Sequence, residues 1–185
     1  MTIEDLNPEL SKFSALLKPL PIYNRFFSRL FRFVGGLSPR KIPNGVKLSA
    51  DIAGGVKIDL YQPVEEILDV AFLCLHGGGY VIGEPAMNDK QCSRLAAKHT
   101  ALVVSPDYGL APEFPFPAAL DDVIMTYNWM VENVDRFGID PAKIIIIGQS
   151  AGGGLAAAAC QRIRDLGGQQ PAAQLLIYPM LDDRT

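Results

Sequence analysis

The chain has 185 residues, of which 49% are hydrophobic and 20% are charged, and its formal net charge is −3. This length suits one domain with a sizeable core, and the composition excludes a disordered chain. Because the chain has no basic excess and no long basic cluster, it lacks the electrostatic footprint of nucleic-acid binding. We therefore expect a globular protein without a nucleic-acid partner.

The start of the chain is rich in apolar residues at helical spacing. Pro19 and Pro21 divide this stretch in two, and Gly35-Gly36 ends it. We expect residues 1–42 to form a helical segment whose aromatic side chains either pack on the core or line a substrate pocket. The first residues show no basic region followed by an apolar one, so we expect no signal peptide.

Strands and helices alternate from residue 43 onward. Two β-prone runs flank Gly54-Gly55 and predict a hairpin. The other predicted strands are apolar throughout, which is typical of a parallel sheet covered by helices on both faces. The fold class is thus α/β, with a mostly parallel central sheet. The predicted strands are 46–52, 56–61, 70–75, 101–105, 144–147 and 175–178, and the helices are 89–98, 118–134 and 155–166.

The three cysteines, Cys74, Cys92 and Cys160, follow no metal-binding or disulfide spacing. Each lies in an apolar stretch, so we expect buried free thiols, no metal site, and a reducing compartment, namely the cytoplasm. Residues 144–160 carry no charge, but their glycines make a buried strand and helix a better explanation than a membrane span.

A G-x-S-x-G sequence, residues 148–152, lies between a predicted strand and a predicted helix. A nucleophile elbow requires that context. A serine on so sharp a turn has a strained backbone, and side chains two positions before and after it would clash, which explains Gly148 and Gly152. Alone, the motif could be a glycine-rich turn without chemistry. The flanking strand and helix favour Ser150 as a catalytic nucleophile at the amino end of a helix.

A second glycine-rich segment, His76-Gly-Gly-Gly-Tyr80, directly follows the strand predicted at 70–75. Three glycines allow backbone N–H groups to face a substrate oxygen, and this motif accompanies the elbow in esterases and lipases. The predicted oxyanion donors are Gly77, Gly78 and Ala151. A phosphate-binding loop is the alternative, but no G-K-[ST] sequence follows and no helix begins at once.

These two motifs, together with residues 107–122, 138–143 and 178–183, resemble the hormone-sensitive-lipase-like branch of bacterial carboxylesterases. The resemblance covers nearly all of residues 40–185. It implies an α/β-hydrolase fold. It also implies an enzyme that cleaves small-molecule esters with short to medium acyl chains through an acyl-enzyme on Ser150. It also implies that no cofactor is needed and that residues 1–42 contribute to a helical cap.

The sequence departs from the family at two positions. Gln149 stands where Asp is usual, and it can still form hydrogen bonds. Gly109 stands where Arg is usual, which removes a donor and predicts lower local rigidity. By the same resemblance, Asp107 and Glu113 match structural positions, so we assign them no direct chemistry.

The family's triad runs along the chain as Ser, then acid, then His, yet no histidine follows Ser150. We expect His76 to fix the oxyanion turn and His99 to lie on the surface, at the edge of the sheet opposite Ser150. Nor do the later acids suit the triad, because one lies on a solvated helix face and the others match a non-catalytic Asp-Asp. These acids are Asp165, Asp182 and Asp183.

We therefore expect residues 43–185 to be a truncated α/β-hydrolase core that lacks its last strands and has little turnover alone. Its last strand would then form an apolar edge that is open to self-association. Three readings stay open. The chain is part of a longer esterase, or a second polypeptide supplies the Asp and His, or it is a non-catalytic ligand-binding or interaction protein.

Overall fold

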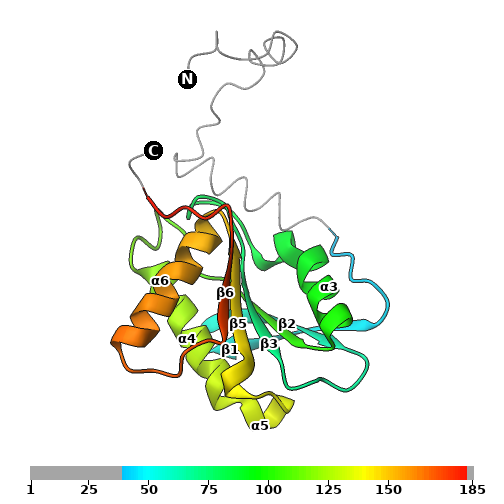
Figure 1. Cartoon of the computed structure of the whole chain (residues 1–185). Helices are drawn as coiled ribbons and strands as arrows, with labels where there is room; N and C mark the ends of the chain where they lie inside the picture. Colours follow the sequence, from blue (N-terminus) through cyan, green and yellow to red (C-terminus); the bar gives the residue numbers. More distant parts are fainter. Residues whose placement is uncertain (1–38, 183–185) are drawn as a thin grey trace.

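A six-stranded sheet forms the centre of the computed structural model, which describes residues 39–182 (Figure 1). The strand order is β1-β2-β4-β3-β5-β6. β2 pairs antiparallel with β1 and β4, and the remaining neighbours are parallel. The sequence-based expectation of a mostly parallel α/β sheet is confirmed. The strands are β1 Val46–Ala53, β2 Val56–Pro63, β3 Ala71–Leu75, β4 Leu102–Pro106, β5 Ile144–Gln149 and β6 Ala173–Ile177.

The first two strands form the predicted hairpin. Ala53 pairs with Val56 across the turn, and Gly54 and Gly55 have φ angles of 58° and 101°. A two-residue turn whose central residues both have positive φ matches the right-handed twist of the strands that it joins. The glycine pair therefore sets the register of the hairpin.

Helices cover both faces of the sheet. Helix α3 (Asp89–His99) lies on one face, and α4 (Ala118–Glu132) and α6 (Ala151–Asp165) lie on the other (Figure 1). Three short helices lie in the connections, η2 (Pro85–Asn88), α5 (Val134–Phe137) and η3 (Pro141–Lys143). No helix of residues 39–182 has the length and apolar character needed to cross a bilayer.

Two helix boundaries differ by two or more residues from the sequence-based expectation. The helix predicted at 118–134 ends at Glu132, and the Asn133 side chain that follows donates to the Trp129 carbonyl. The helix predicted at 155–166 begins at Ala151, four residues earlier, and includes three consecutive glycines. Glycine disfavours a helix by about 1 kcal/mol per residue, but close packing on the sheet overrides that preference here.

Each face of the sheet has its own hydrophobic core. On the α3 side the core includes Phe72, Cys92 and Val103, and on the α4 and α6 side it includes Tyr127 and Ile146. Strands β3 and β4 are buried along their whole length. The expectation of buried free thiols is confirmed for Cys74 and Cys92. Cys160 is also a free thiol, but it is only half-buried.

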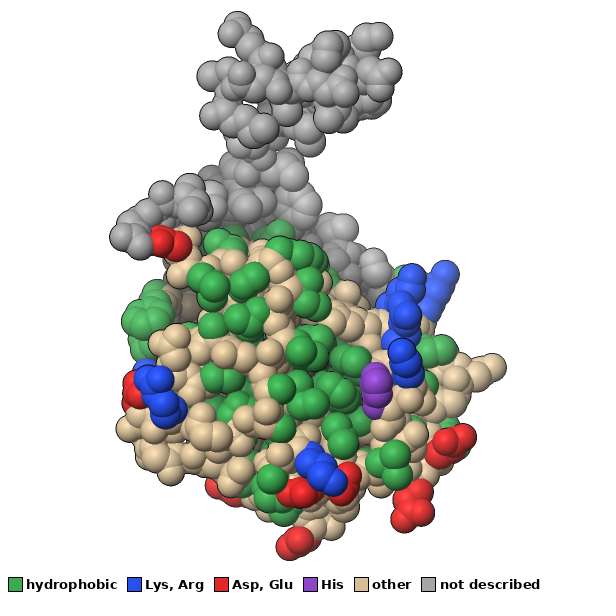
Figure 2. Space-filling model, viewed as in Figure 1, with side chains coloured by type: hydrophobic (Ala, Val, Ile, Leu, Met, Phe, Trp, Pro, Cys, Tyr) green, Lys and Arg blue, Asp and Glu red, His purple; other side chains and the backbone are tan. Residues whose placement is uncertain are grey.

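Strand β6 is the edge strand beside β5 in the described part of the sheet. Its first three residues are exposed, and Leu175 has 45% of its surface accessible. Figure 2, seen from the same side as Figure 1, shows hydrophobic side chains over the middle of this face, with Lys and Arg side chains toward its margins. The helical segment expected at 1–42 falls almost entirely in residues 1–38, outside the described part.

Candidate active site

Ser150 occupies a strained turn between β5 and α6. Its backbone angles are φ 53° and ψ −120°, a region that residues with a side chain rarely adopt. Backbone hydrogen bonds hold it there, since the Ser150 N–H donates to the Ile177 carbonyl and the Met180 N–H donates to the Ser150 carbonyl, both at 3.0 Å. The expected strained turn is confirmed, and the chain beyond β5 helps to maintain it.

The two glycines of the G-x-S-x-G sequence stand where a side chain cannot fit. A Cβ on Gly148 would lie 2.1 Å from the Gly152 carbonyl oxygen. A Cβ on Gly152 would lie 2.4 Å from the carbonyl oxygens of Leu75 and His76. The predicted steric reason for both glycines is therefore confirmed, and it includes contacts with β3 as well as contacts inside the turn.

The glycine turn after β3 packs directly against the elbow. A Cβ on Gly77 would lie 3.1 Å from the Gln149 carbonyl oxygen and 3.4 Å from Ser150 Cβ. Gly78 has a φ of 123°, and its carbonyl accepts hydrogen bonds from the N–H groups of Val81 and Ile82. The structure thus brings together the two segments that sequence reasoning paired.

Ala151 is the first residue of α6 and is fully buried. An N–H in the first turn of a helix has no partner four residues earlier in that helix, and it lies at the positive end of the helix dipole. The position of Ala151 directly after Ser150 therefore suits a donor to a developing negative charge.

His76 fixes the glycine turn, as expected. Its Nδ1–H donates to the Gly77 carbonyl at 2.8 Å, and the Tyr108 hydroxyl donates to the His76 carbonyl at 2.6 Å. The two rings stack with centroids 4.1 Å apart. Burial lowers the pKa of His76 to about 4, so the ring is neutral at neutral pH. Sequence reasoning missed Tyr108, because only the fold brings it to His76.

His99 lies at the carboxyl end of α3, where it is exposed and its ring centroid is 5.9 Å from that of Phe72. It precedes β4, whereas Ser150 follows β5, and these two strands run in the same direction on either side of β3. His99 is therefore at the opposite edge of the sheet from Ser150, as predicted.

Gln149 and Gly109, the two residues that depart from the family pattern, both form hydrogen bonds to side chains. Gln149 forms hydrogen bonds to Asn88 and Tyr178, as its amide was expected to do. The Gly109 N–H donates to Asp122 Oδ2 at 2.8 Å, and a Cβ on Gly109 would lie 2.8 Å from Phe114 Cβ. The Gly109 N–H thus has a side-chain partner, and Phe114 lies where a side chain at position 109 would have to begin.

An apolar cavity of about 470 Å³ borders the candidate site. Tyr80 of the glycine turn and Gly154 of the first turn of α6 line it, together with Phe114 and Leu155. Tyr80 has a φ of 64°, and a Cβ on Gly154 would lie 2.5 Å from the Tyr80 hydroxyl. This cavity can hold an apolar group one helical turn from Ser150.

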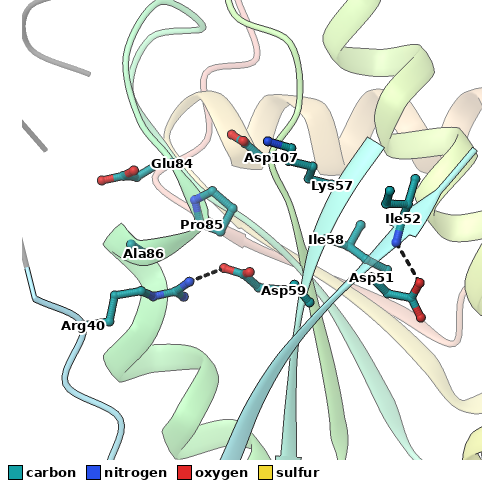
Figure 3. A pocket seen from close by; sticks show the side chains of 11 residues that line it. Arg40, Asp51, Ile52, Lys57, Ile58, Asp59, Glu84, Pro85, Ala86 and Asp107 are labelled. Atoms are coloured by element: carbon teal, nitrogen blue, oxygen red, sulfur yellow. Dashed lines mark hydrogen bonds and ion pairs between the residues drawn. The ribbon is translucent and has the colours of Figure 1, made fainter. Parts of the chain in front are cut away.

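A second pocket, of about 530 Å³, has several charged residues in its lining and lies between the hairpin and the loop before η2 (Figure 3). Burial raises the pKa of three of its four carboxyl groups, Asp59, Glu84 and Asp107, and Arg40 pairs with Asp59 at 2.8 Å. Throughout residues 39–182 no group of His, Cys, Asp and Glu is arranged to hold a metal ion.

A family model described as the alpha/beta hydrolase fold matches residues 72–185. The chain belongs to the α/β-hydrolase family. A crystal structure of an esterase from the bacterial hormone-sensitive lipase family superposes with a TM-score of 0.75 at 32% identity, covering 96% of this chain and 59% of that one. The predicted resemblance to the hormone-sensitive-lipase-like branch is confirmed.

Two curated relatives of the chain are longer than the part that it matches. Esterase LipI of Mycobacterium tuberculosis is 45% identical over 107 residues, which cover 58% of this chain and 33% of LipI. Ethyl acetate hydrolase of Pseudomonas putida is 36% identical over 131 residues, which cover 68% of this chain and 41% of the hydrolase. The matched part of the chain thus spans about a third to two fifths of these relatives.

Proposed function

We propose that this chain carries the nucleophile and oxyanion half of a serine carboxylesterase site. Ser150 would form an acyl-enzyme, and the N–H groups of Gly77, Gly78 and Ala151 would bind the oxyanion. The observation that carries the proposal is the packing of the Gly77 turn against a strained Ser150, with a distance of 3.4 Å from the Gly77 Cβ position to Ser150 Cβ.

The proposed reaction is acyl transfer in two steps. Ser150 Oγ attacks the ester carbonyl, its proton passes to a base, and the tetrahedral intermediate expels the alcohol. Water then attacks the acyl-enzyme and releases the carboxylic acid and the free serine. The oxyanion that forms in each step lies in front of the glycine turn and the start of α6, where N–H groups are fixed in advance.

The acyl preference rests on the apolar cavity beside Tyr80 and Gly154. A cavity of about 470 Å³ can accept a short or medium chain of the ester. The proposed substrates are therefore esters with short or medium acyl chains, and the proposed reaction needs no cofactor.

The sequence holds two histidines, and neither is placed to take the proton of Ser150. The His76 ring is engaged with Gly77 and Tyr108, and His99 lies at the opposite edge of the sheet. In a serine protease, loss of the base costs about six decades in turnover, or roughly 8 kcal/mol of barrier. We infer that the 185-residue chain alone has little or no esterase turnover.

Chemical rescue tests this proposal. The chain is incubated with p-nitrophenyl butyrate, with and without imidazole as an external base, and the acylated peptide is identified by mass spectrometry. We expect slow, imidazole-dependent acylation of Ser150 that Ser150→Ala abolishes. Acylation equal in Ser150→Ala would refute the nucleophile, and enzyme-like turnover without imidazole would refute the missing base.

A non-catalytic ligand-binding or interaction protein is the second candidate. It is favoured by the combination of an open apolar cavity and the absence of a placed histidine among the described residues. A phenyl alkyl ketone, which resembles an ester but cannot be cleaved, distinguishes the two candidates. Saturable binding of the ketone, together with no acylation of Ser150 by p-nitrophenyl butyrate in imidazole, would favour the binder.

Two further proposals concern the surroundings of the chain. The exposed residues of β6 support self-association through this edge, because unpaired backbone groups on an apolar edge strand pair readily with another strand. The free thiols Cys74, Cys92 and Cys160 support a cytoplasmic location, since disulfides are rare there.

A further inference from the structure

A row of side-chain hydrogen bonds crosses the ends of three neighbouring strands at the elbow. The Tyr178 hydroxyl donates to Gln149 Oε1 at 3.0 Å, and Gln149 Nε2 donates to Asn88 Oδ1 at 3.0 Å. Asn88 Nδ2 in turn donates to Cys74 Sγ at 3.6 Å. Tyr178 follows β6, and Gln149 ends β5. Asn88 directly precedes α3, and Cys74 lies on β3. The strands β3, β5 and β6 are adjacent in the sheet. We call this row the amide relay.

The amide relay joins the nucleophile to the loop that carries the oxyanion turn. Gln149 precedes Ser150 directly. Asn88 belongs to the same connection between β3 and α3 as Gly77 and Gly78. The hydrogen bond from Gln149 to Asn88 therefore links the two halves of the proposed site at a second point, beyond the packing of Gly77 on Ser150.

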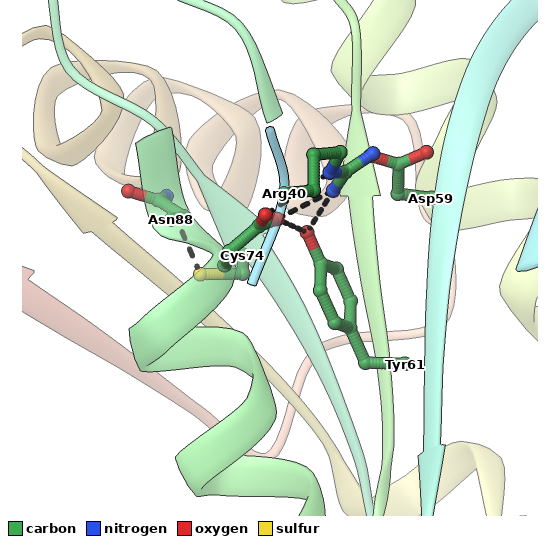
Figure 4. Close-up of polar contacts among 6 residues, drawn as sticks. Arg40, Asp59, Tyr61, Cys74 and Asn88 are labelled. Atoms are coloured by element: carbon green, nitrogen blue, oxygen red, sulfur yellow. Dashed lines mark hydrogen bonds and ion pairs between the residues drawn. The ribbon is translucent and has the colours of Figure 1, made fainter. Parts of the chain in front are cut away.

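The far end of that loop is firmly anchored. Asn88 is 2% exposed. The next residue, Asp89, accepts hydrogen bonds from Arg40 Nε at 3.0 Å and from the Tyr61 hydroxyl at 2.7 Å. Figure 4 shows Arg40 also reaching Asp59, which lies on β2 as Tyr61 does. Asn88 is thus a fixed point, and a bond to it limits how far the elbow can move relative to the loop.

We propose that Gln149 is a positioning residue that sets the distance between Ser150 and the oxyanion turn. The inference rests on the proposed function, because it concerns the same two halves of that site. A shift of about 1 Å in a reacting group can slow a reaction by about 100-fold. Loss of the hydrogen bond from Gln149 to Asn88 should therefore reduce the acylation rate. The chain should stay folded, because the packing of Gly77 on Ser150 remains.

The carboxamide at position 149 bonds to both of its neighbours, which a side chain without polar atoms cannot do. In the relay it accepts from Tyr178 and donates to Asn88, and if both amides are turned over it still accepts on one side and donates on the other. A carboxylate only accepts, but it can accept from the Tyr178 hydroxyl and from Asn88 once the Asn88 amide is turned over. Glutamate at this position can therefore keep both hydrogen bonds, whereas methionine cannot.

The test compares Gln149→Met and Gln149→Glu with the wild-type chain in imidazole-assisted acylation of Ser150 between pH 5 and pH 8. We expect Gln149→Met to lower the rate roughly tenfold at every pH. Gln149→Glu should keep most of the wild-type rate, because its carboxylate can accept hydrogen bonds from both neighbours. Gln161→Met, at an exposed position on α6, is the matched control and should keep the wild-type rate.

Rescue by Gln149→Glu separates the hydrogen bonds of Gln149 from a merely space-filling role, which Gln149→Met would serve as well. A wild-type rate in Gln149→Met would overturn the proposal, as would an equal loss of rate in Gln149→Met and Gln149→Glu. If wild-type Ser150 is acylated no faster than Ser150→Ala, the proposed function fails, and backbone amide exchange then decides the positioning role. Faster exchange of residues 76–80 and 149–152 in Gln149→Met than in Gln161→Met supports it, and equal exchange overturns it.

Discussion

Gly152 of the elbow helix and His76 of the oxyanion turn are in backbone contact, because a Cβ on Gly152 would lie 2.4 Å from the His76 carbonyl oxygen. The Leu75 carbonyl oxygen lies at the same distance from that position. Both obstacles are main-chain atoms at the end of a buried strand, so neither can move aside as a flexible side chain would. The first turn of α6 can therefore approach the sheet only without a side chain at this position.

Replacement of this glycine should be severe. Gly152→Ala gains about 1 kcal/mol of helix propensity but forces α6 away from β3, and overpacking against backbone should lower the free energy of unfolding by more than about 3 kcal/mol. Urea denaturation followed by circular dichroism measures the change. The control is Gly168→Ala, where the nearest atom belongs to the Ile163 side chain at 3.2 Å. An equal, small effect of both substitutions would contradict the packing argument.

The buried His76 should make the protein sensitive to acid. The unfolded ring binds a proton near pH 6.5, whereas burial lowers the folded pKa to about 4. The unfolded state therefore binds more protons between these values, and the free energy of unfolding falls as pH falls through that window. The slope is about 1.4 kcal/mol per pH unit, and the total is roughly 3 kcal/mol.

Denaturation midpoints between pH 7 and pH 4 test this window. His76→Asn keeps a side-chain N–H donor but cannot be protonated, so we expect it to be less stable at pH 7 and to lose less stability on acidification. His99→Asn is the same change at an exposed site, and it should retain the wild-type pH dependence. A wild-type acid response in His76→Asn would assign the effect to other groups.

Two arginines of this protein should differ in their contribution to stability. Arg40 contacts Asp89, whose side chain is 12% exposed, and removal of Arg40 leaves that carboxylate partly buried without its cation. We expect Arg40→Met to lower the free energy of unfolding by about 2 kcal/mol, less than for a fully buried pair because Arg40 is 31% exposed.

Arg136 supplies the matched control for that measurement. It pairs with Asp51 at 2.7 Å, but its side chain is 53% exposed. Arg136→Met should change stability by less than about 1 kcal/mol, because an exposed ion pair gains little over hydration. Equal losses in the two variants, measured by urea denaturation, would mean that Asp89 is not held in the way described.

The sequence was sufficient to predict the strands, the hairpin and the pairing of the two glycine motifs, because each depends on local patterns. Apolar runs identify the buried strands, and Gly54-Gly55 fits the hairpin turn. The start of α6 was missed because its glycines argue locally against a helix, and only contact with Leu75 and His76 explains them.

Contacts between distant residues were beyond sequence reasoning. Asn88 and Gln149 are 61 positions apart, and Tyr108 and His76 are 32 apart. No local periodicity marks such pairs, because the strand order β4-β3-β5 alone brings their loops together. The nucleophile and its glycine turn could thus be predicted, whereas the side chains that hold them in place could not.

The edge strand β6 should make association depend on concentration. Leu175 is 45% exposed on this strand, and an unpaired apolar edge is a template for pairing with a second copy. We expect sedimentation velocity to show reversible self-association that Leu175→Lys weakens, because a lysine on an edge strand opposes strand pairing. Leu166→Lys, at a 68% exposed position after α6, should leave association unchanged. A monomer at all concentrations, or equal association in both variants, would show that β6 is not the contact surface.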